Sequence, residues 1–255
     1  MAHLILDNIS FDAGRWPLNA DLPTIFFVHG SGNNRLFWKN QLIALNDCAN
    51  TVAVDLPGHG DSPGPDMDSV NDFAQVVETL IDTLQAPMPV PCGLSLGGAV
   101  ALQLLLNGKG RYYAGILINT GSRLKVMPEI FDMIKNDYNA YAESSPKLAT
   151  SPHTDPGLLK ELVAEAKKCR AEVAYMDFAA CNSFDVMGRL QEISEQVLVL
   201  SAEDDRLTPP KYAQYLCNGI PKSKNVNIPR AGHLSPIERP DDVNQTIREF
   251  IEEIK

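Results

Sequence analysis

The sequence has few cysteines and little positive charge. Its five cysteines are odd in number, and none stands in a CxxC arrangement. This disfavours a disulfide framework and a zinc ribbon, and it fits a reducing compartment. The 22 basic residues face 32 acidic ones, for a net charge of −10. Without a basic stripe, nucleic acid and anionic membranes are poor partners.

Two further patterns are missing. The N-terminal residues lack the basic and apolar regions of a signal peptide. No apolar run approaches the roughly 20 residues that a membrane span needs. These features predict a protein with no membrane segment and a cytoplasmic location.

Short apolar stretches alternate with segments of helical periodicity along most of the 255 residues. "PTIFFVHG" and "NTVAVDLPGHG" are typical of buried strands, and "SVNDFAQVVETLIDTL" has a clear helical period. Such alternation predicts an α/β fold with a mostly parallel central sheet flanked by helices.

The pattern changes between residues 123 and 190, which are polar and helical with no strong strand. Sixty-eight residues are too many for a plain connection. We interpret this segment as a helical lid inserted into a core made of residues 1–122 and 191–255.

The stretch "VPCGLSLGGA" places Ser95 between a predicted strand and a predicted helix. This G-x-S-x-G context is typical of a nucleophile elbow. Gly93 and Gly97 would permit a turn too tight for side chains, and the turn would strain the serine and expose its hydroxyl. The Leu96 amide would then face an oxyanion. A plain glycine-rich turn can have the same letters, so a base and an acid are needed.

Of the five histidines, His233 is the candidate base because it follows the last predicted strand. His29 and His59 precede the serine and are better explained as shaping loops. His3 is terminal, and His153 lies in the predicted lid. A loop histidine satisfied by backbone groups is the alternative for each.

The acid should lie between serine and histidine, at the end of a strand. "VLVLSAEDDRLTPP" offers Asp204 and Asp205 there. Such a carboxylate fixes the imidazole tautomer and stabilises the imidazolium. A solvated acidic turn accounts for at least one of Glu203, Asp204 and Asp205.

With these motifs the sequence resembles the α/β-hydrolase superfamily over nearly its whole length. "FFVHGSGNNRLFW", "VDLPGHGDS", "GLSLGG", "LSAEDDRLTPP" and "AGHLSPIERP" carry the resemblance. It implies Ser95 as nucleophile, His233 as base and the amide of Ser31 as second oxyanion donor. Ala202 occupies the family's glycine position before the acid, which selects Asp205 and leaves Asp204 as the alternative.

Within the superfamily, "CGLSLGG", "NTGSR" and "HLSPIE" are most similar to the 3-oxoadipate enol-lactonase branch and its esterase relatives. A serine nucleophile sets aside dehalogenases and epoxide hydrolases. Leu234 after the histidine disfavours carbon–carbon bond hydrolases. Glu238 matches the family's acidic residue after the histidine, which we interpret as a structural hydrogen-bonding group.

The predicted function is hydrolysis of small or medium carboxylic esters through an acyl-enzyme, with no metal or organic cofactor. We expect a small-molecule ester or lactone as partner, and a monomer or homodimer. One alternative is an enol-lactonase, whose anionic substrate would need a basic residue such as Arg123 or Arg170. The other is a hydrolase-fold receptor with slow turnover. The predicted substrate-binding residues are Phe131, Tyr138, Tyr175, Phe178, Phe184 and Leu234.

One feature departs from an ordinary central strand. Pro89 and Pro91 stand inside the strand that leads to the serine, where proline is disfavoured. Residues two apart direct their amides to the same neighbouring strand. We therefore expect the loss on one flank only, with Met88, Val90 and Cys92 serving the other.

Overall fold

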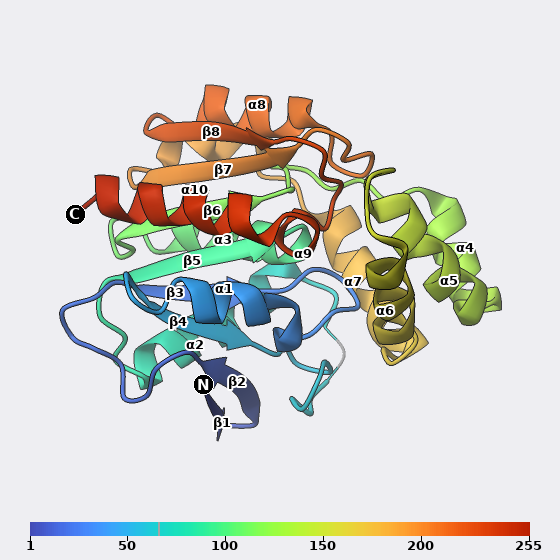
Figure 1. Cartoon of the computed structure of the whole chain (residues 1–255), viewed down its shortest axis with the longest axis horizontal. Helices are drawn as coiled ribbons and strands as arrows, with labels where there is room; N and C mark the ends of the chain where they lie inside the picture. The colour runs from blue at the N-terminus through green and yellow to red at the C-terminus, as the bar shows by residue number, and fades with distance from the viewer. Residues whose placement is uncertain (66) are drawn as a thin grey trace.

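The computed structural model describes residues 1–65 and 67–255, built around one eight-stranded sheet (Figure 1). The strand order is β1-β2-β4-β3-β5-β6-β7-β8. Only the pairs β1–β2 and β2–β4 are antiparallel among the described strands. The predicted α/β fold with a mostly parallel sheet is confirmed. The strands are β1 (Ala2–Leu6), β2 (Ile9–Ala13), β3 (Thr24–Val28), β4 (Asn50–Val54), β5 (Pro89–Leu94), β6 (Ala114–Ile118), β7 (Gln196–Ala202) and β8 (Ser223–Ile228).

Helices cover both faces of the sheet. In Figure 1, α1 and α10 lie in front of the strands and α3 lies behind them. Side chains from α1 and α10 join one hydrophobic cluster, and side chains from α2, α3 and α8 join the other. The core helices are α1 (Lys39–Ala44), α2 (Val70–Thr83), α3 (Leu96–Asn107), α8 (Pro210–Gly219), α9 (Ser235–Glu238) and α10 (Pro240–Glu253), with 3₁₀ turns η1 (Arg35–Trp38) and η2 (Met187–Glu192).

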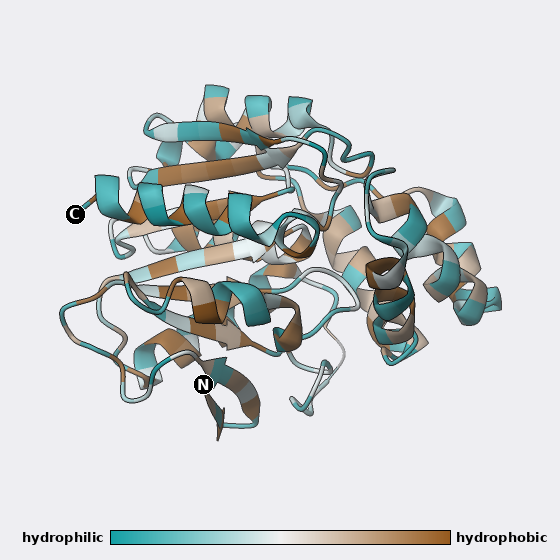
Figure 2. Cartoon of the chain, viewed as in Figure 1, coloured by the Kyte–Doolittle hydropathy of each residue, from teal (hydrophilic) through white to brown (hydrophobic). Residues whose placement is uncertain are grey.

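The hydropathy of the elements follows this layering. Central strands are brown and the outward faces of the helices are teal in Figure 2. This is the pattern of a sheet buried on both faces. Within the described residues, none of the helices has both the length and the apolar character to cross a membrane.

The prolines of β5 affect one flank of that strand, as expected. β5 pairs with β3 from Pro89 to Gly93, but with β6 only from Cys92 to Leu94. The carbonyl of Pro89 still accepts from the amide of Tyr113, so this flank faces β6. The missing amide hydrogens therefore shorten the β5–β6 ladder and leave it intact just before the serine.

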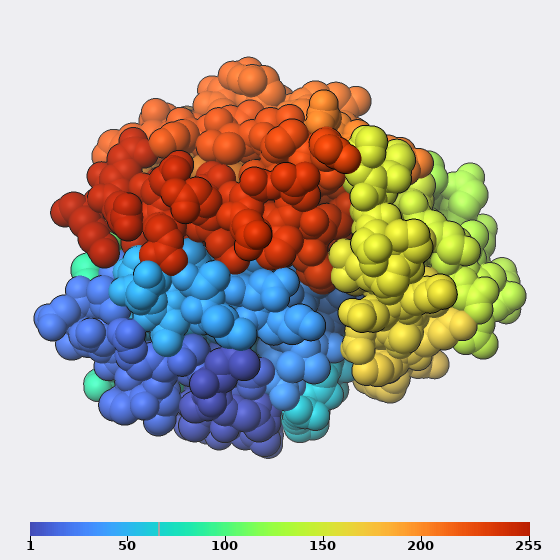
Figure 3. Space-filling model, in the orientation of Figure 1, coloured from blue at the N-terminus to red at the C-terminus, as the bar shows by residue number. Residues whose placement is uncertain are grey.

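Four helices form the predicted insertion between β6 and β7, which we call the cap. They are α4 (Pro128–Asn136), α5 (Tyr138–Ala149), α6 (Pro156–Ala166) and α7 (Ala171–Ser183). The cap is a separate lobe at one end of the sheet (Figures 1 and 3). Two chain segments join the cap to the core, and we call them the crossings. They lie side by side, because Arg123 and Asp185 form an antiparallel bridge. The boundaries at residues 123 and 190 stay a prediction.

Candidate active site

The turn between β5 and α3 holds Ser95 in a strained backbone conformation. Its φ of 55° and ψ of −115° are unusual for a residue with a side chain. The glycines on either side explain how the turn closes. A Cβ on Gly93 would lie 2.0 Å from the carbonyl oxygen of Gly97, and one on Gly97 would lie 2.1 Å from that of Val28. The half-buried Ser95 therefore occupies the elbow that the sequence predicts.

Three residues at the end of β6 connect Ser95 to the histidine loop. The Ser95 amide donates to the carbonyl of Ile118 (3.1 Å), and Thr120 Oγ1 donates to the Ser95 carbonyl (2.8 Å). Between them, Asn119 Nδ2 donates to the carbonyl of His233 (2.9 Å). Asn119 was not identified from the sequence, although "NTGS" directly follows a strand. Segment 118–120 thus holds both Ser95 and His233.

The ring of His233 is bonded to a buried carboxylate. Its Nδ1 lies 2.9 Å from Asp205 Oδ2, and Thr208 Oγ1 donates to the same oxygen over 2.7 Å. The amides of Leu207 and Thr208 donate to Asp205 Oδ1. Burial alone would raise the pKa of Asp205, but the charge and hydrogen bond of His233, with the bonds from Thr208, lower it. The carboxylate of Asp205 is therefore placed, as an anion, to orient the imidazole ring of His233.

The neighbouring carboxylate faces away from this ring. Asp204 Oδ2 accepts from the hydroxyl of Ser151, just after α5 in the cap (2.5 Å). Among the described residues no hydrogen bond joins Ser95 Oγ to the ring of His233, and such contacts often tighten only when substrate binds. The two adjacent acids therefore have different partners: Asp205 contacts His233, and Asp204 contacts the cap.

The cap also contacts the backbone of the histidine loop. The amide of His233 donates to the carbonyl of Ala149, at the end of α5, over 2.6 Å. Glu238 joins the two segments as well, which agrees with the hydrogen-bonding role predicted for it. Its carboxylate accepts from the amides of Ser151, Gly232 and Leu234 and from the hydroxyl of Thr154. The position of His233 therefore depends on the cap.

The loop after β3 lies against the serine. A Cβ on Gly30 would be 3.4 Å from Ser95 Cβ. The loop is closed by a hydrogen bond from the Asn33 amide to the Gly30 carbonyl (3.2 Å). In the part of the chain that the structure describes, neither the Ser31 amide nor the Leu96 amide donates to a protein acceptor. Both amides are therefore available to a ligand, and their role as oxyanion donors stays a prediction.

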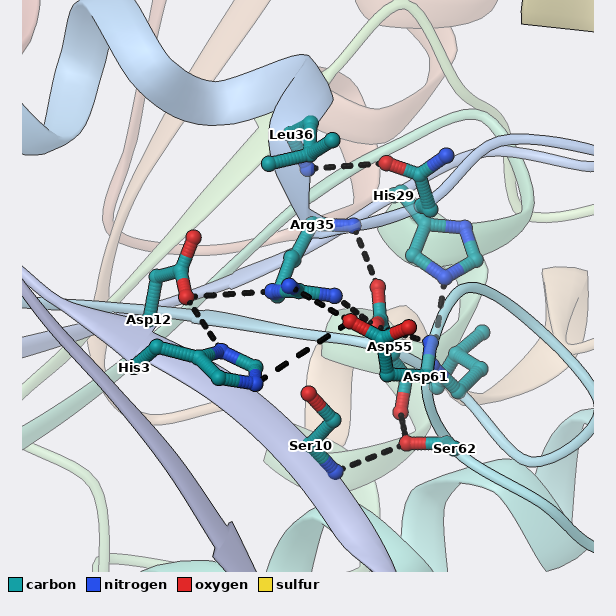
Figure 4. Close-up of polar contacts among 11 residues, drawn as sticks. His3, Ser10, Asp12, His29, Arg35, Leu36, Asp55, Asp61 and Ser62 are labelled. Carbon is teal, nitrogen blue, oxygen red and sulfur yellow. Dashed lines mark hydrogen bonds and ion pairs between the residues drawn. The ribbon is translucent and has the colours of Figure 1, made fainter.

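A charge cluster with Arg35 and Asp55 buried at its centre lies next to this loop (Figure 4). Asp55, at the end of β4, accepts from the amide of Arg35 (2.6 Å) and is paired with the Arg35 guanidinium. The same guanidinium also pairs with Asp12 and Asp61. This cluster was not predicted from the sequence, because its members come from β2, η1 and the loop after β4, which are far apart along the chain. It fixes η1 and the loop after β4 against each other.

His29 and His59 contact the backbone of the loops after β3 and β4, which agrees with the prediction that they shape loops. Leu56 donates its amide to His29 Nε2, and His29 Nδ1 faces the carbonyl of Gly30, so this ring is neutral. Burial, and then the charge of His59, hold the pKa of His29 well below its ordinary value. The rings of His29 and His59 are 4.8 Å apart.

Most of the predicted substrate-binding residues lie in an aromatic cluster of the cap. Phe131 contacts Tyr175 at 5.1 Å between ring centres, and Tyr141 contacts both Tyr138 and Phe178. Tyr138 also donates its hydroxyl to the carbonyl of Ala166. Phe184 and Leu234 are instead buried in the two main core clusters. The contribution of all six to substrate binding stays a prediction.

The thiols near the site are poor nucleophiles. Cys92 is fully buried, and burial raises the pKa of its thiol well above the ordinary value. Burial also raises the pKa of Cys181 to about 12. Within residues 1–65 and 67–255, histidine, cysteine and acidic side chains form no group of three that could hold a metal ion.

The sequence and the fold are similar to those of known proteins. A putative carbamate hydrolase of Caulobacter segnis is 28% identical over 263 residues, covering 97% of both chains. The 3-oxoadipate enol-lactonase 2 of Acinetobacter baylyi is 26% identical over 236 residues, covering 89% of this chain and 88% of that protein. A thermophilic esterase from Thermogutta terrifontis, solved with malate bound, is 26% identical. It superposes with a TM-score of 0.85, covering 96% of this chain and 93% of that one.

A family model also matches most of the chain. The model of the alpha/beta hydrolase family matches residues 25–246, from β3 to the last helix. That range includes the elbow, the loop after β3, the acid turn and the histidine loop. From this match and this fold, we conclude that the chain belongs to the alpha/beta hydrolase family.

Proposed function

We propose that the protein is a serine hydrolase that cleaves small or medium carboxylic esters through an acyl-enzyme at Ser95. The observation that carries this proposal is the bond between His233 Nδ1 and Asp205 Oδ2, on a loop that Asn119 connects to Ser95. A base oriented by an acid next to a strained serine is the arrangement that activates a hydroxyl nucleophile.

In the proposed reaction, His233 Nε2 takes the proton of Ser95 Oγ as the oxygen attacks the ester carbonyl. The tetrahedral oxyanion binds the amides of Ser31 and Leu96, which donate to no acceptor among the described residues. Asp205 stabilises the imidazolium, which then gives its proton to the leaving alcohol. Water, activated by His233, repeats the sequence on the acyl-enzyme and releases the acid and free Ser95.

The relatives support hydrolysis at an acyl carbon in general rather than one substrate. Their names cover an enol-lactonase, a putative carbamate hydrolase and an esterase. These reactions share an attack on a carbonyl and an oxyanion, and they differ in the leaving group. A preference for small or medium acyl groups is our proposal from the aromatic, well-filled cap, where Tyr141 is buried among its neighbours.

A second candidate function is hydrolysis of an anionic lactone or ester. A half-open cavity of about 400 Å³ adjoins the two crossings into the cap. Tyr212 lines this cavity and packs against Gly121, one residue beyond Thr120. A carboxylate on the substrate would be attracted to the cations there. The cavity is lined by Ser122, Arg123, Lys125, Met187, Lys211, Tyr212 and Tyr215.

One experiment tests the proposal and separates the alternatives. The purified protein and Ser95→Ala are treated with a fluorophosphonate probe, and turnover is measured on 4-nitrophenyl esters of increasing acyl length and on lactones with and without a carboxylate. We expect stoichiometric labelling that requires Ser95, a peak at short or medium acyl chains, and turnover lower by roughly four to six orders of magnitude in Ser95→Ala.

Other outcomes would point elsewhere. Near-normal turnover in Ser95→Ala would refute a serine hydrolase mechanism. Labelling without turnover on any substrate would favour the hydrolase-fold receptor. A preference for carboxylate-bearing lactones that Arg123→Ala abolishes would favour the lactonase function.

A further inference from the structure

An acidic side chain of the cap reaches the loop that carries the proposed oxyanion donor. Asp177 belongs to α7, and its side chain is 1% exposed. Its Oδ2 accepts from the amide of Gly32 over 2.8 Å and lies 2.9 Å from His59 Nε2. Gly32 directly follows Ser31. One carboxylate oxygen therefore connects the cap, the loop after β3 and the loop after β4.

The partner of Asp177 is a cation. His59 Nδ1 faces the carbonyl of Pro57 over 3.0 Å, so both ring nitrogens of His59 face acceptors and both carry protons. Burial alone would lower the pKa of His59, but the charge and hydrogen bond of Asp177 raise it. The pair is neutral overall, so the carboxylate does not repel a negative charge that develops beside Ser95.

Stability alone is a poor reason for this arrangement. A buried ion pair is often no more stabilising than apolar residues of similar volume. Asp177 Oδ1 is also buried and has no hydrogen-bond partner within residues 1–65 and 67–255, which is unfavourable. The other carboxylate oxygen, Oδ2, accepts from the amide of Gly32, the residue after Ser31. Gly32 has a φ of +70°, a conformation open mainly to glycine.

We propose that Asp177 is a positioning residue for the reaction at Ser95. By accepting from the Gly32 amide, it fixes the peptide that follows Ser31. The bond from Asn33 to Gly30 closes the turn on the other side. Together they keep the Ser31 amide directed at the oxyanion, where a small misalignment costs rate rather than substrate affinity. This inference rests on the proposed function, and it makes the cap a part of the catalytic machinery.

The test compares Asp177→Ala, which removes the acceptor, with Asp177→Asn, which keeps one. We expect Asp177→Ala to lower kcat roughly 10- to 100-fold with KM changed less than about 3-fold. Affinity for a trifluoromethyl ketone, which forms an oxyanion by adding Ser95, should fall by about the same factor as kcat/KM. Asp177→Asn should restore most of both. Glu172→Ala, an exposed acid on the same helix, is the matched control and should behave as wild type.

A second variant separates positioning from folding. Asp177→Ala leaves His59 without its partner, so the unfolding temperature of this variant can fall. His59→Phe combined with Asp177→Ala replaces the pair by apolar groups and should recover that temperature, while kcat and ketone affinity stay low. If either folded variant has kcat and ketone affinity within about 2-fold of wild type, the inference is wrong. Failure of the proposed function would look different, since wild type would then lack turnover or Ser95→Ala would keep it.

Discussion

The amide of His233 donates to the carbonyl of Ala149 over 2.6 Å, so a cap helix holds the base of the proposed triad. The approach is close enough to exclude a side chain beside it. A Cβ on Gly232 would lie 2.5 Å from the same carbonyl oxygen. Any movement of the end of α5 would therefore move the imidazole as well.

Removal of Glu238 should loosen the cap. In Glu238→Ala, the amides of Ser151, Gly232 and Leu234 lose their shared acceptor, and we expect the free energy of unfolding to fall by about 2 kcal/mol. Urea unfolding measures this, and limited proteolysis should cut faster in the segment that follows α5. The exposed Glu252 provides the control variant Glu252→Ala, which should match wild type. Equal stability of the two variants would contradict the role given to Glu238.

The elbow should not tolerate a methyl group at Gly97. A Cβ there would lie 2.1 Å from the carbonyl oxygen of Val28, so Gly97→Ala must displace β3 or α3. We expect a loss of about 3 kcal/mol in unfolding free energy and a large fall in turnover. Gly188→Ala is the matched control, because a Cβ at Gly188 meets nothing within 4 Å. A Gly97→Ala protein with wild-type stability would show that the turn is less tight than described.

Asp205→Asn should reduce turnover by roughly 10⁴-fold, because the amide would favour the wrong tautomer of His233. Steady-state ester hydrolysis measures this. Asp204→Asn is the control, since Asp204 bonds to Ser151 rather than to the histidine, and it should keep most of the activity. The reverse ranking would exchange the roles of the two acids.

Asp205 should also shape acid denaturation. Burial would raise its pKa, but His233 and Thr208 lower it, so the native pKa is below the unfolded value of about 3.9. The resulting stabilisation is present above that value and is lost as the pH falls through the native pKa. Below about pH 4, wild type should therefore lose stability more steeply than Asp205→Asn in circular dichroism. Parallel curves would argue against an ionised Asp205.

The pair of His59 and Asp177 predicts the opposite pH dependence. Burial lowers the pKa of His59, but the charge and hydrogen bond of Asp177, together with the Pro57 carbonyl and the charge of Asp55, raise it above the unfolded value of about 6.5. Its stabilisation is complete below that value and is lost as the pH rises through the native pKa. Urea unfolding from pH 6 upward should show this loss in wild type and not in His59→Gln. His153→Gln, at an exposed histidine, should keep the wild-type slope, and a loss of slope there would assign the effect to the wrong ring.

Local patterns predicted the parts of the molecule that depend on neighbours in the sequence. The elbow at Ser95 could be predicted because strand, tight turn and helix are consecutive. The placement of His233 near the segment that holds Ser95 could be predicted because a loop after the last strand returns to the same edge of the sheet. The effect of the β5 prolines could be predicted in the same way, since consecutive residues of a strand direct their amides to opposite neighbouring strands.

The rest depends on pairings between distant segments. Spacing alone did not separate Asp204 from Asp205, because which carboxylate meets His233 depends on how the turn after β7 meets both the cap and the histidine loop. Asp177 lies 118 residues from His59, and nothing in the periodicity of α7 marks it. The predicted aromatics of the cap largely contact one another, since helices that form their own small core must bury such side chains.

The contacts of the cap bear on how a new substrate range could be engineered. Exchange of caps between related hydrolases is attractive, because the two crossings lie side by side and the graft would need only two junctions. In this protein, the exchange would also remove the carbonyl that holds His233 and the carboxylate that holds Gly32. A donor cap would have to supply both acceptors, so in this protein substrate specificity and reaction rate could not be changed independently by exchanging the cap.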